Sequence, residues 1–183
     1  MRFLTGVVLI WIGICFCPFK ACAEVDTGRQ TGSTPYDQWL GPVRTAFARL
    51  PGKQPSIDEV RASLRTAFRF RYFFDPARPY VPQAPEVTEA RRQGDCKAKS
   101  LWLATKMGDR KARYVVGKAS TQSRLAHAWL LWPSGGIWII LDPTNTSEII
   151  VAEQVAGKKL FPKYSYNAGG AYVHPSYSQY AKD

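Results

Sequence analysis

The stretch that decides the fold is RRQGDCKAKSLWLATKMG, residues 91–108, in which one cysteine begins an apolar helical segment. Asp95 is a residue type that caps helix N-termini, and Gly108 is a natural helix stop. The residues between them are apolar on most sides of the predicted helix, which indicates that the helix is buried. Cys96 falls in the first turn, where free backbone N–H groups and the helix dipole favour a thiolate. The same N–H groups can hold the oxyanion that forms when a thiolate attacks a carbonyl.

A second stretch, AHAWLLWPSGGIWIILDPTN at residues 126–145, contains two runs of aromatic and β-branched residues separated by PSGG. This pattern predicts a β-hairpin with a four-residue loop at residues 133–136. That loop length places His127 directly opposite Asp142, with Cβ atoms about 4.5–5.5 Å apart. A carboxylate at this distance fixes the tautomer of the imidazole and favours its charged form. We therefore predict a triad in which these two residues act with Cys96.

Each of these residues also has an ordinary structural interpretation. Cys96 can be a buried apolar residue or an inert surface thiol. His127 can be a structural histidine, and Asp142 can start the turn before Pro143. The lone cysteine at a helix start, combined with the opposed histidine and aspartate, favours catalysis. His174, the other histidine of the chain, has no such neighbours, and we predict that it is structural or exposed.

The first 23 residues predict a secretory signal peptide. They combine a positive start, a mostly apolar run at residues 3–17 and the small-residue site Ala21-Cys22-Ala23 before Glu24. The run is short for a membrane span, so we expect no stable membrane insertion once residues 1–23 are removed. Lipidation of Cys22 and an uncleaved anchor are the alternatives.

Removal of this segment takes away three of the four cysteines and leaves Cys96 alone. A single cysteine in an oxidising compartment, where thiols usually pair, is a candidate reactive thiol. We therefore predict a periplasmic or secreted protein. Residues 24–34 are small and polar and predict a flexible mature N-terminus. Residues 35–183 predict one domain, because no repeat, low-complexity tract or linker divides them.

The charge of the chain favours some partners over others. A formal net charge of +11 at pH 7 attracts anionic surfaces and substrates. The basic residues are scattered and match no nucleic-acid motif, so we expect no nucleic-acid partner. No cluster has zinc-ligand spacing and no glycine loop cradles a phosphate, so no metal and no cofactor is predicted. The expected partner is a protein or peptide substrate, with an acidic envelope component suggested by the charge.

Taken together, these motifs resemble the transglutaminase-like superfamily and, within it, the bacterial transglutaminase-like cysteine proteinases. The resemblance rests on three segments between about Trp39 and Thr144: Gly94-Asp95-Cys96 opening a helix, Ala126-His127-Ala128-Trp129 starting a strand, and Leu141-Asp142-Pro143 ending the next. It implies an α+β, papain-like fold, in which N-terminal helices and the cysteine helix pack on an antiparallel β-sheet.

The resemblance also implies roles for individual residues. Cys96 would be the nucleophile, His127 the general base and acid, and Asp142 the orienting carboxylate. Members of this group that act on biofilm adhesins often carry acidic residues just after the cysteine, associated with calcium. Lysine, alanine and lysine stand at positions 97–99 here, which argues against calcium dependence and against an adhesin substrate. Gln93 lies shortly before the cysteine and is a candidate oxyanion donor.

We therefore expect an exported thiol hydrolase, a cysteine peptidase or amidase that works through an acyl-enzyme. If an amine intercepts the acyl-enzyme in place of water, the same site becomes a protein transamidase. A different class is a non-catalytic envelope binding module on the same fold, which an unreactive thiol would reveal. A third class is a binder of anionic polymers, which would lose affinity steeply with salt.

Overall fold

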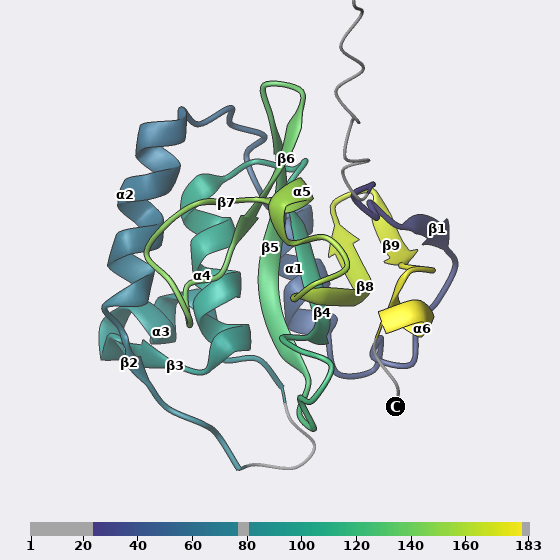
Figure 1. Ribbon diagram of the computed structural model, residues 1–183. Coiled ribbons are helices and arrows are strands. Elements are labelled where there is room, and N and C mark those ends of the chain that lie inside the picture. The colour runs from purple at the N-terminus through teal and green to yellow at the C-terminus, as the bar shows by residue number, and fades with distance from the viewer. Residues whose placement is uncertain (1–23, 77–80, 181–183) are drawn as a thin grey trace, which may run out of the picture.

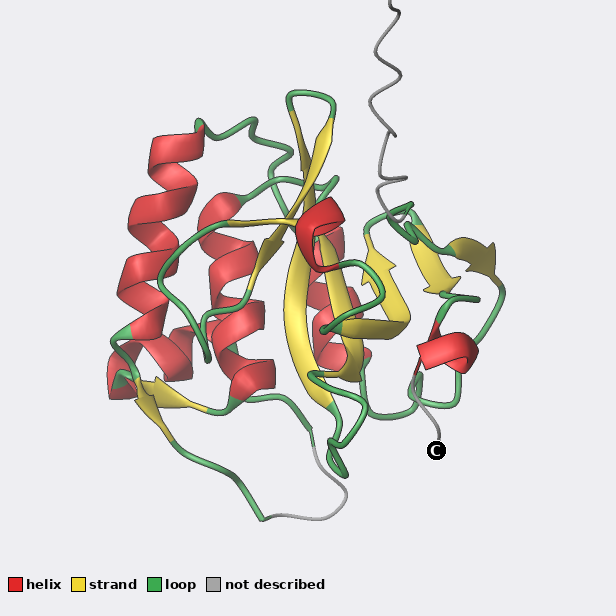
Figure 2. Cartoon of the chain, in the orientation of Figure 1, coloured by secondary structure: helices red, strands yellow, loops and turns green. Residues whose placement is uncertain are grey.

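The computed structural model of the protein describes residues 24–76 and 81–180 (Figure 1). The predicted signal peptide, residues 1–23, lies outside the described residues. The described chain has an α+β fold in which helices pack against a seven-stranded antiparallel sheet (Figure 2). No helix in the described part of the chain has the length and apolar character needed to cross a membrane.

Helices and strands follow one another along the chain in this order: β1 (Arg29–Thr31), α1 (Gly41–Ala48), α2 (Ile57–Phe68), β2 (Arg71–Tyr72), α3 (Pro85–Arg91), β3 (Gln93–Gly94), α4 (Cys96–Met107), β4 (Arg113–Lys118), β5 (His127–Ser134), β6 (Ile137–Leu141), β7 (Ile150–Val151), α5 (Ala152–Val155), β8 (Phe161–Asn167), β9 (Gly170–Val173) and α6 (Tyr177–Tyr180). The large sheet has the strand order β1-β9-β8-β4-β5-β6-β7. Strands β2 and β3 form a separate parallel pair.

The main core lies between one face of the sheet and the helices α1, α2 and α4. Helix α2 begins at a capping box, in which Ser56 and Glu59 satisfy each other's backbone N–H groups. Its inner face is apolar at Val60, Leu64 and Ala67. Helix α4 is buried along most of its length and lies between α2 and β5 (Figure 1). The core therefore holds the helix that begins at the cysteine against β4 and β5.

A smaller core covers the opposite face of the sheet. Side chains of β4, β5 and β6 on this face pack against α5 and the segment that follows it; the buried members are Val115, Trp129, Leu131, Ile140, Ala152, Val155 and Leu160. Val25, near the start of the described chain, packs against the same cluster. The sheet is thus covered on both faces.

The hairpin of β5 and β6 turns more tightly than predicted. Its loop is Gly135-Gly136 alone, because the register pairs Ser134 with Ile137. Both glycines have positive φ, 58° and 82°, which is the requirement of a two-residue turn that matches the twist of the strands. The prediction of a four-residue loop, and with it the direct opposition of His127 and Asp142, was wrong.

The N-terminal segment also differs from the prediction. Residues 24–34 were expected to be flexible, but β1 pairs antiparallel with β9 at the edge of the sheet. Asp26 accepts backbone hydrogen bonds from Gly28 and Ser176, at 2.8 Å each. Thr34 is buried, and its hydroxyl is hydrogen-bonded to the hydroxyl of Tyr166. The folded unit therefore begins before residue 35, because these contacts join the start of the chain to its last strands.

Candidate active site

Cys96 is the first residue of α4 and is 4 % exposed. The side chain of Asp95 caps the helix as predicted, accepting hydrogen bonds from the N–H groups of Lys97 and Ala98 at 2.9 and 3.0 Å. Gly94 lets the chain approach the helix closely, since a Cβ at this position would lie 2.8 Å from the Cβ of Ala98. The local sequence thus places the thiol at a capped helix N-terminus.

Two hydrogen bonds hold the start of α4 against the sheet. The hydroxyl of Ser100 donates to the carbonyl oxygen of Ala128 at 3.1 Å, and Ala128 is the residue after His127. The hydroxyl of Tyr114, on β4, donates to the carbonyl oxygen of Lys97 at 3.3 Å. Because these bonds join residues next to Cys96 and His127, they set the distance between the helix start and the strand start.

A buried lysine joins the same helix to α2. Lys99 is 2 % exposed, and its ammonium group donates to the carbonyl oxygens of Phe70 and Phe68 at 3.0 and 3.3 Å. Burial lowers the pKa of Lys99, while interactions with Asp142 and Cys96 act in the opposite direction. The ammonium group satisfies carbonyls at the end of α2 and adds positive potential close to the thiol.

His127 begins β5 and lies against Asp142, the first residue after β6. Its Nε2 is 2.8 Å from Oδ2 of Asp142, although the two residues are not directly opposed. Continuing the observed register would set Asp142 opposite Trp129, which makes it a diagonal neighbour of His127 on the same face. A shift of two residues preserves the face of every side chain, so the predicted pairing survives the wrong register.

The side chain of Cys96 also raises the pKa of His127, and the two residues line the same cleft. The ring stacks on Trp129, with centroids 5.8 Å apart. The structure therefore brings together the three residues Cys96, His127 and Asp142 that the sequence singles out.

The pKa values of the histidine and the aspartate move apart. Burial favours the neutral imidazole, but hydrogen bonds to Asp142 and Cys96 outweigh burial and raise the pKa of His127 to about 9. Burial opposes ionisation of Asp142, yet the hydrogen bond from His127 and those from Asn145 and Thr144 lower the pKa of its carboxyl group. At neutral pH the pair is an imidazolium held by a carboxylate.

Cys96 and His127 lie in a cleft of about 870 Å³. Its lining is mostly apolar and comes from the segment before α1, from β2, from the start of α4, from β4 and from the loops on either side of the β5–β6 hairpin; the sixteen residues are Tyr36, Trp39, Leu40, Tyr72, Phe74, Cys96, Lys97, Val116, Ala119, Ser123, Arg124, Leu125, Ala126, His127, Thr144 and Asn145. A cleft of this size and composition is typical of sites that bind organic ligands. The thiol and the imidazole therefore face a space that a substrate can enter.

Gln93, the predicted oxyanion donor, is not among the residues that line this cleft. Its side-chain oxygen accepts a hydrogen bond from Arg71 at 2.5 Å. This contact belongs to the β2–β3 pair, in which Arg71 stands beside Gln93. The structure thus keeps Gln93 apart from the other predicted site residues, because a pairing over 22 residues of sequence directs its side chain elsewhere.

Two residues of the site were missed in the sequence. Asn145 donates to Oδ2 of Asp142 at 2.8 Å and lies 3.2 Å from Nε2 of His127. The turn sequence Asp142-Pro-Thr-Asn145 was a signal for it, since an aspartate that begins a turn accepts hydrogen bonds from the residues that follow it. Tyr72 lines the same cleft as Cys96, and burial together with its interaction with Cys96 raises the pKa of the tyrosine. No sequence pattern pointed to it.

The described residues contain no group of three or more histidine, cysteine, aspartate or glutamate side chains that could hold a metal ion. Asp95, the acidic residue nearest the thiol in sequence, is already matched by two backbone N–H groups and by the ammonium of Lys97 at 3.2 Å. The cation that balances this carboxylate is a side chain of the protein itself.

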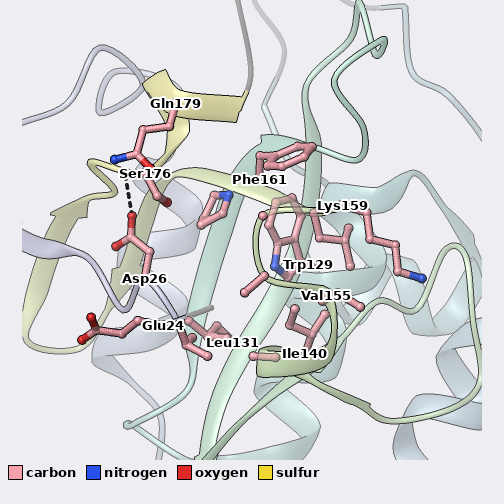
Figure 3. A pocket seen from close by; sticks show the side chains of 16 residues that line it. Glu24, Asp26, Trp129, Leu131, Ile140, Val155, Lys159, Phe161, Ser176 and Gln179 are labelled. Carbon is pink, nitrogen blue, oxygen red and sulfur yellow. Dashed lines mark hydrogen bonds between the residues drawn. The ribbon is translucent and has the colours of Figure 1, made fainter. Parts of the chain in front are cut away.

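A second cavity of about 250 Å³ lies on the other face of the sheet (Figure 3). Figure 3 shows Trp129, Leu131 and Ile140 as its floor, with Glu24 and Asp26 along one side. Neither a cysteine nor a histidine lines it, within the described part of the chain. The thiol chemistry is therefore confined to the larger cleft.

Three structures of LapG from Legionella pneumophila are similar to this chain. The TM-scores are 0.55 for LapG, 0.56 for its EGTA-treated form and 0.54 for its calcium-bound form, each at 22 % sequence identity. The matches cover 78–80 % of this chain and 78–80 % of LapG. No protein-family model and no curated protein sequence matches the chain. At this identity the likeness shows the fold: the chain shares the fold of LapG, with helices packed on an antiparallel sheet, and the α+β class that its sequence predicted is confirmed.

Proposed function

We propose that the protein is a cysteine peptidase or amidase in which Cys96 is the nucleophile, His127 the general acid and base, and Asp142 the orienting carboxylate. The observation that carries the proposal is the position of the His127 imidazole, which is hydrogen-bonded to Asp142 at 2.8 Å and lines the same cleft as Cys96. Nucleophile, base and orienting group in this order are the arrangement that activates a thiol.

Acylation begins from an ion pair. The imidazolium of His127 lies beside the sulfur, which favours the thiolate of Cys96 in the resting enzyme. The thiolate attacks the carbonyl carbon of the substrate, and a C–S bond forms while the carbonyl oxygen becomes an oxyanion. Nδ1–H of His127 then gives its proton to the leaving amine, and the C–N bond breaks. The product is a thioester between the acyl group and Cys96.

The oxyanion needs a hydrogen-bond donor at the start of α4. Asp95 accepts from the N–H groups of Lys97 and Ala98, so the N–H group of Cys96 is the first-turn donor that remains for the substrate. The positive end of the α4 dipole supports the same charge. This backbone donor takes the place that the sequence had suggested for Gln93.

Deacylation uses the same imidazole as a base. Neutral His127 takes a proton from water at Nδ1, the resulting hydroxide attacks the thioester, and the C–S bond breaks to restore the thiolate. The carboxylate of Asp142 keeps the Nε2–H tautomer and the ring orientation through both steps. If an amine reaches the thioester in place of water, the same steps make an amide bond and the reaction is transamidation.

Mass spectrometry of an envelope extract tests the proposal. Extract is incubated with the wild-type protein and, as a matched control, with Cys96→Ala. We expect new peptide N-termini that the control does not produce. Isopeptide cross-links in place of new N-termini would identify a transamidase. Identical peptide profiles for the two proteins would favour a non-catalytic binding module.

We propose further that the protein is exported and acts in the periplasm or outside the cell. The support is the sequence of residues 1–23, with its apolar run and its small-residue site before Glu24. Sequencing of the N-terminus of exported protein is expected to give Glu24 as the first residue. A start at Met1, or a lipid on Cys22, would contradict cleavage at this site.

A further inference from the structure

Apolar residues from two parts of the chain line the cleft that holds Cys96. One wall is formed by Tyr36, Trp39 and Leu40, ahead of α1, together with Val116 of β4. The rings of Tyr36 and Trp39 are 6.0 Å apart between centroids, and Tyr36 also packs edge-on against Tyr164 at 5.7 Å. These contacts fix the wall in place, so it offers a preformed surface to a ligand.

The cleft is also lined by large apolar side chains that solvent reaches. Tyr72, Phe74 and Leu125 are 52 %, 44 % and 73 % exposed, and all three line the cleft. Exposed large apolar residues that gather at one place mark a binding surface, because a partner that covers them removes their apolar area from water. Leu125 stands on the β4–β5 loop two residues before His127, so this surface reaches the reacting groups.

Apart from Cys96 and His127, the charged side chains that line the cleft are basic. Among the described residues that line it, none is an aspartate or a glutamate, and the two charged ones besides His127 are Lys97 and Arg124. Lys97 is paired with Asp95 at 3.2 Å. Arg124 is exposed, and its side chain makes no ion pair with a described residue. The cleft thus presents one uncompensated cation close to an apolar surface.

We infer that the substrate of this site is an extended polypeptide segment that carries bulky apolar side chains and an acidic side chain within about three residues of the bond cleaved. The inference rests on the proposed peptidase function and specifies its substrate. Apolar side chains bury the exposed rings and Leu125, and the acidic side chain pairs with Arg124. A cleft of about 870 Å³ has room for several residues of an extended chain, each advancing about 3.3 Å.

Binding to an inert variant tests the inference without catalysis. The probes are two labelled ten-residue peptides with blocked ends, centred on Phe-Leu and identical except for one aspartate or one lysine beside that pair. Fluorescence anisotropy measures their affinity for Cys96→Ala at low salt. We expect the acidic peptide to bind about fivefold more tightly, as an exposed ion pair allows. The preference should disappear in high salt.

Variants in the same background separate the two parts of the surface. Arg124→Glu is expected to reverse the preference, whereas Arg29→Glu, the same charge change on the far edge strand β1, should alter neither affinity by more than about twofold. Trp39→Ala and Leu125→Ser should weaken both peptides about tenfold and leave their ratio unchanged. Leu125 is so exposed that its substitution does not threaten folding.

The outcomes distinguish this inference from the proposed function. Equal affinity for the two peptides, an equal effect of Arg29→Glu and Arg124→Glu, or no effect of the two apolar substitutions would overturn the inference. Peptides that bind as described but resist wild-type enzyme would contradict the peptidase and leave the recognition surface standing. Cleavage that depends on Cys96 but shows no apolar or acidic preference would support the peptidase and overturn the substrate assignment.

Discussion

The chain has two histidines, and each lies against an aspartate, yet their surroundings differ. His127 bonds Asp142 through Nε2, contacts Cys96 and lines the large cleft, with 11 % of its side chain exposed. His174 lies 3.3 Å from Oδ1 of Asp26 and 2.8 Å from the hydroxyl of Ser165, and its side chain is fully buried. Sulfur, imidazole and carboxylate in the first site correspond to hydroxyl, imidazole and carboxylate in the second.

The difference shows that a triad of side chains is not sufficient for chemistry. Ser165 is completely buried, so no carbonyl can reach its hydroxyl. Both nitrogens of His174 are occupied, Nδ1 by the backbone carbonyl oxygen of Asp26 and Nε2 by the hydroxyl of Ser165, and these bonds join residues up to 148 positions apart. The second site therefore has a structural role: it joins the N-terminal segment to the last strands. The first site has an open side for a substrate.

Replacement of each histidine should separate the two roles most strongly. We expect His127→Ala to lower kcat/KM by at least about a thousandfold, since removal of a triad base costs at least that much, and to shift Tm little. His174→Ala should leave kcat/KM of the folded protein within about twofold and lower Tm by several degrees. Peptide turnover and thermal melting of both variants check this. If His127→Ala and His174→Ala lost the same turnover at the same Tm, the two histidines would not have the separate roles assigned to them.

The two aspartates provide the next comparison. Asp142→Asn should lower kcat at least about a hundredfold with little change in Tm, because an amide keeps the shape but not the charge that supports the imidazolium. The turn at Asp142 should persist, since an asparagine oxygen can still accept from the N–H group of Thr144. Turnover and melting of wild type and variant are measured side by side. A variant that keeps a third of the wild-type rate would reduce Asp142 to a turn residue.

Asp26 should act on stability alone. Burial opposes its ionisation, but bonds from His174, Ser176 and Gly28 outweigh burial and hold the pKa of this carboxyl group well below its usual value. A lowered pKa stabilises the fold above the unfolded value near 3.9, and that stabilisation is lost as pH falls below it. Asp26→Asn should therefore cost about 1–3 kcal/mol at pH 7, with a difference from wild type that shrinks below about pH 4. Urea titrations at several pH values measure it; a pH-independent difference would contradict this origin.

The polar neighbours should show the smallest effects. Asn145→Ala removes one donor to Asp142 and should lower kcat about threefold to tenfold, as the loss of one hydrogen bond allows. Ser165→Ala removes the partner of His174 and should change kcat by less than about twofold while lowering Tm. Turnover of the two variants at matched temperature checks the contrast, and a larger catalytic effect of Ser165→Ala would reverse it.

Local rules predicted some parts of the molecule and failed at others for physical reasons. The cap at Asp95 and the helix stop at Gly108 depend on neighbouring residues, so they could be read from the sequence. The His127–Asp142 contact was predicted from a loop of the wrong length, and a register shift of two residues left it intact. The β1–β9 pairing and the Asp26–His174 contact were missed because only the tertiary fold brings these residues together. The contact of Gln93 with Arg71 was missed for the same reason, since Arg71 lies on another strand.

The rate of alkylation of Cys96 by iodoacetamide, measured from pH 6 to pH 8, tests the central claim most directly because it needs no substrate. The pKa of His127 is raised to about 9, so its imidazolium is present over this whole range. We predict a rate that changes less than about threefold, and in His127→Ala a rate that rises close to a hundredfold, as for an ordinary thiol with a pKa of about 8.5. A steep rise in the wild-type protein, equal to that of His127→Ala, would contradict an activated cysteine.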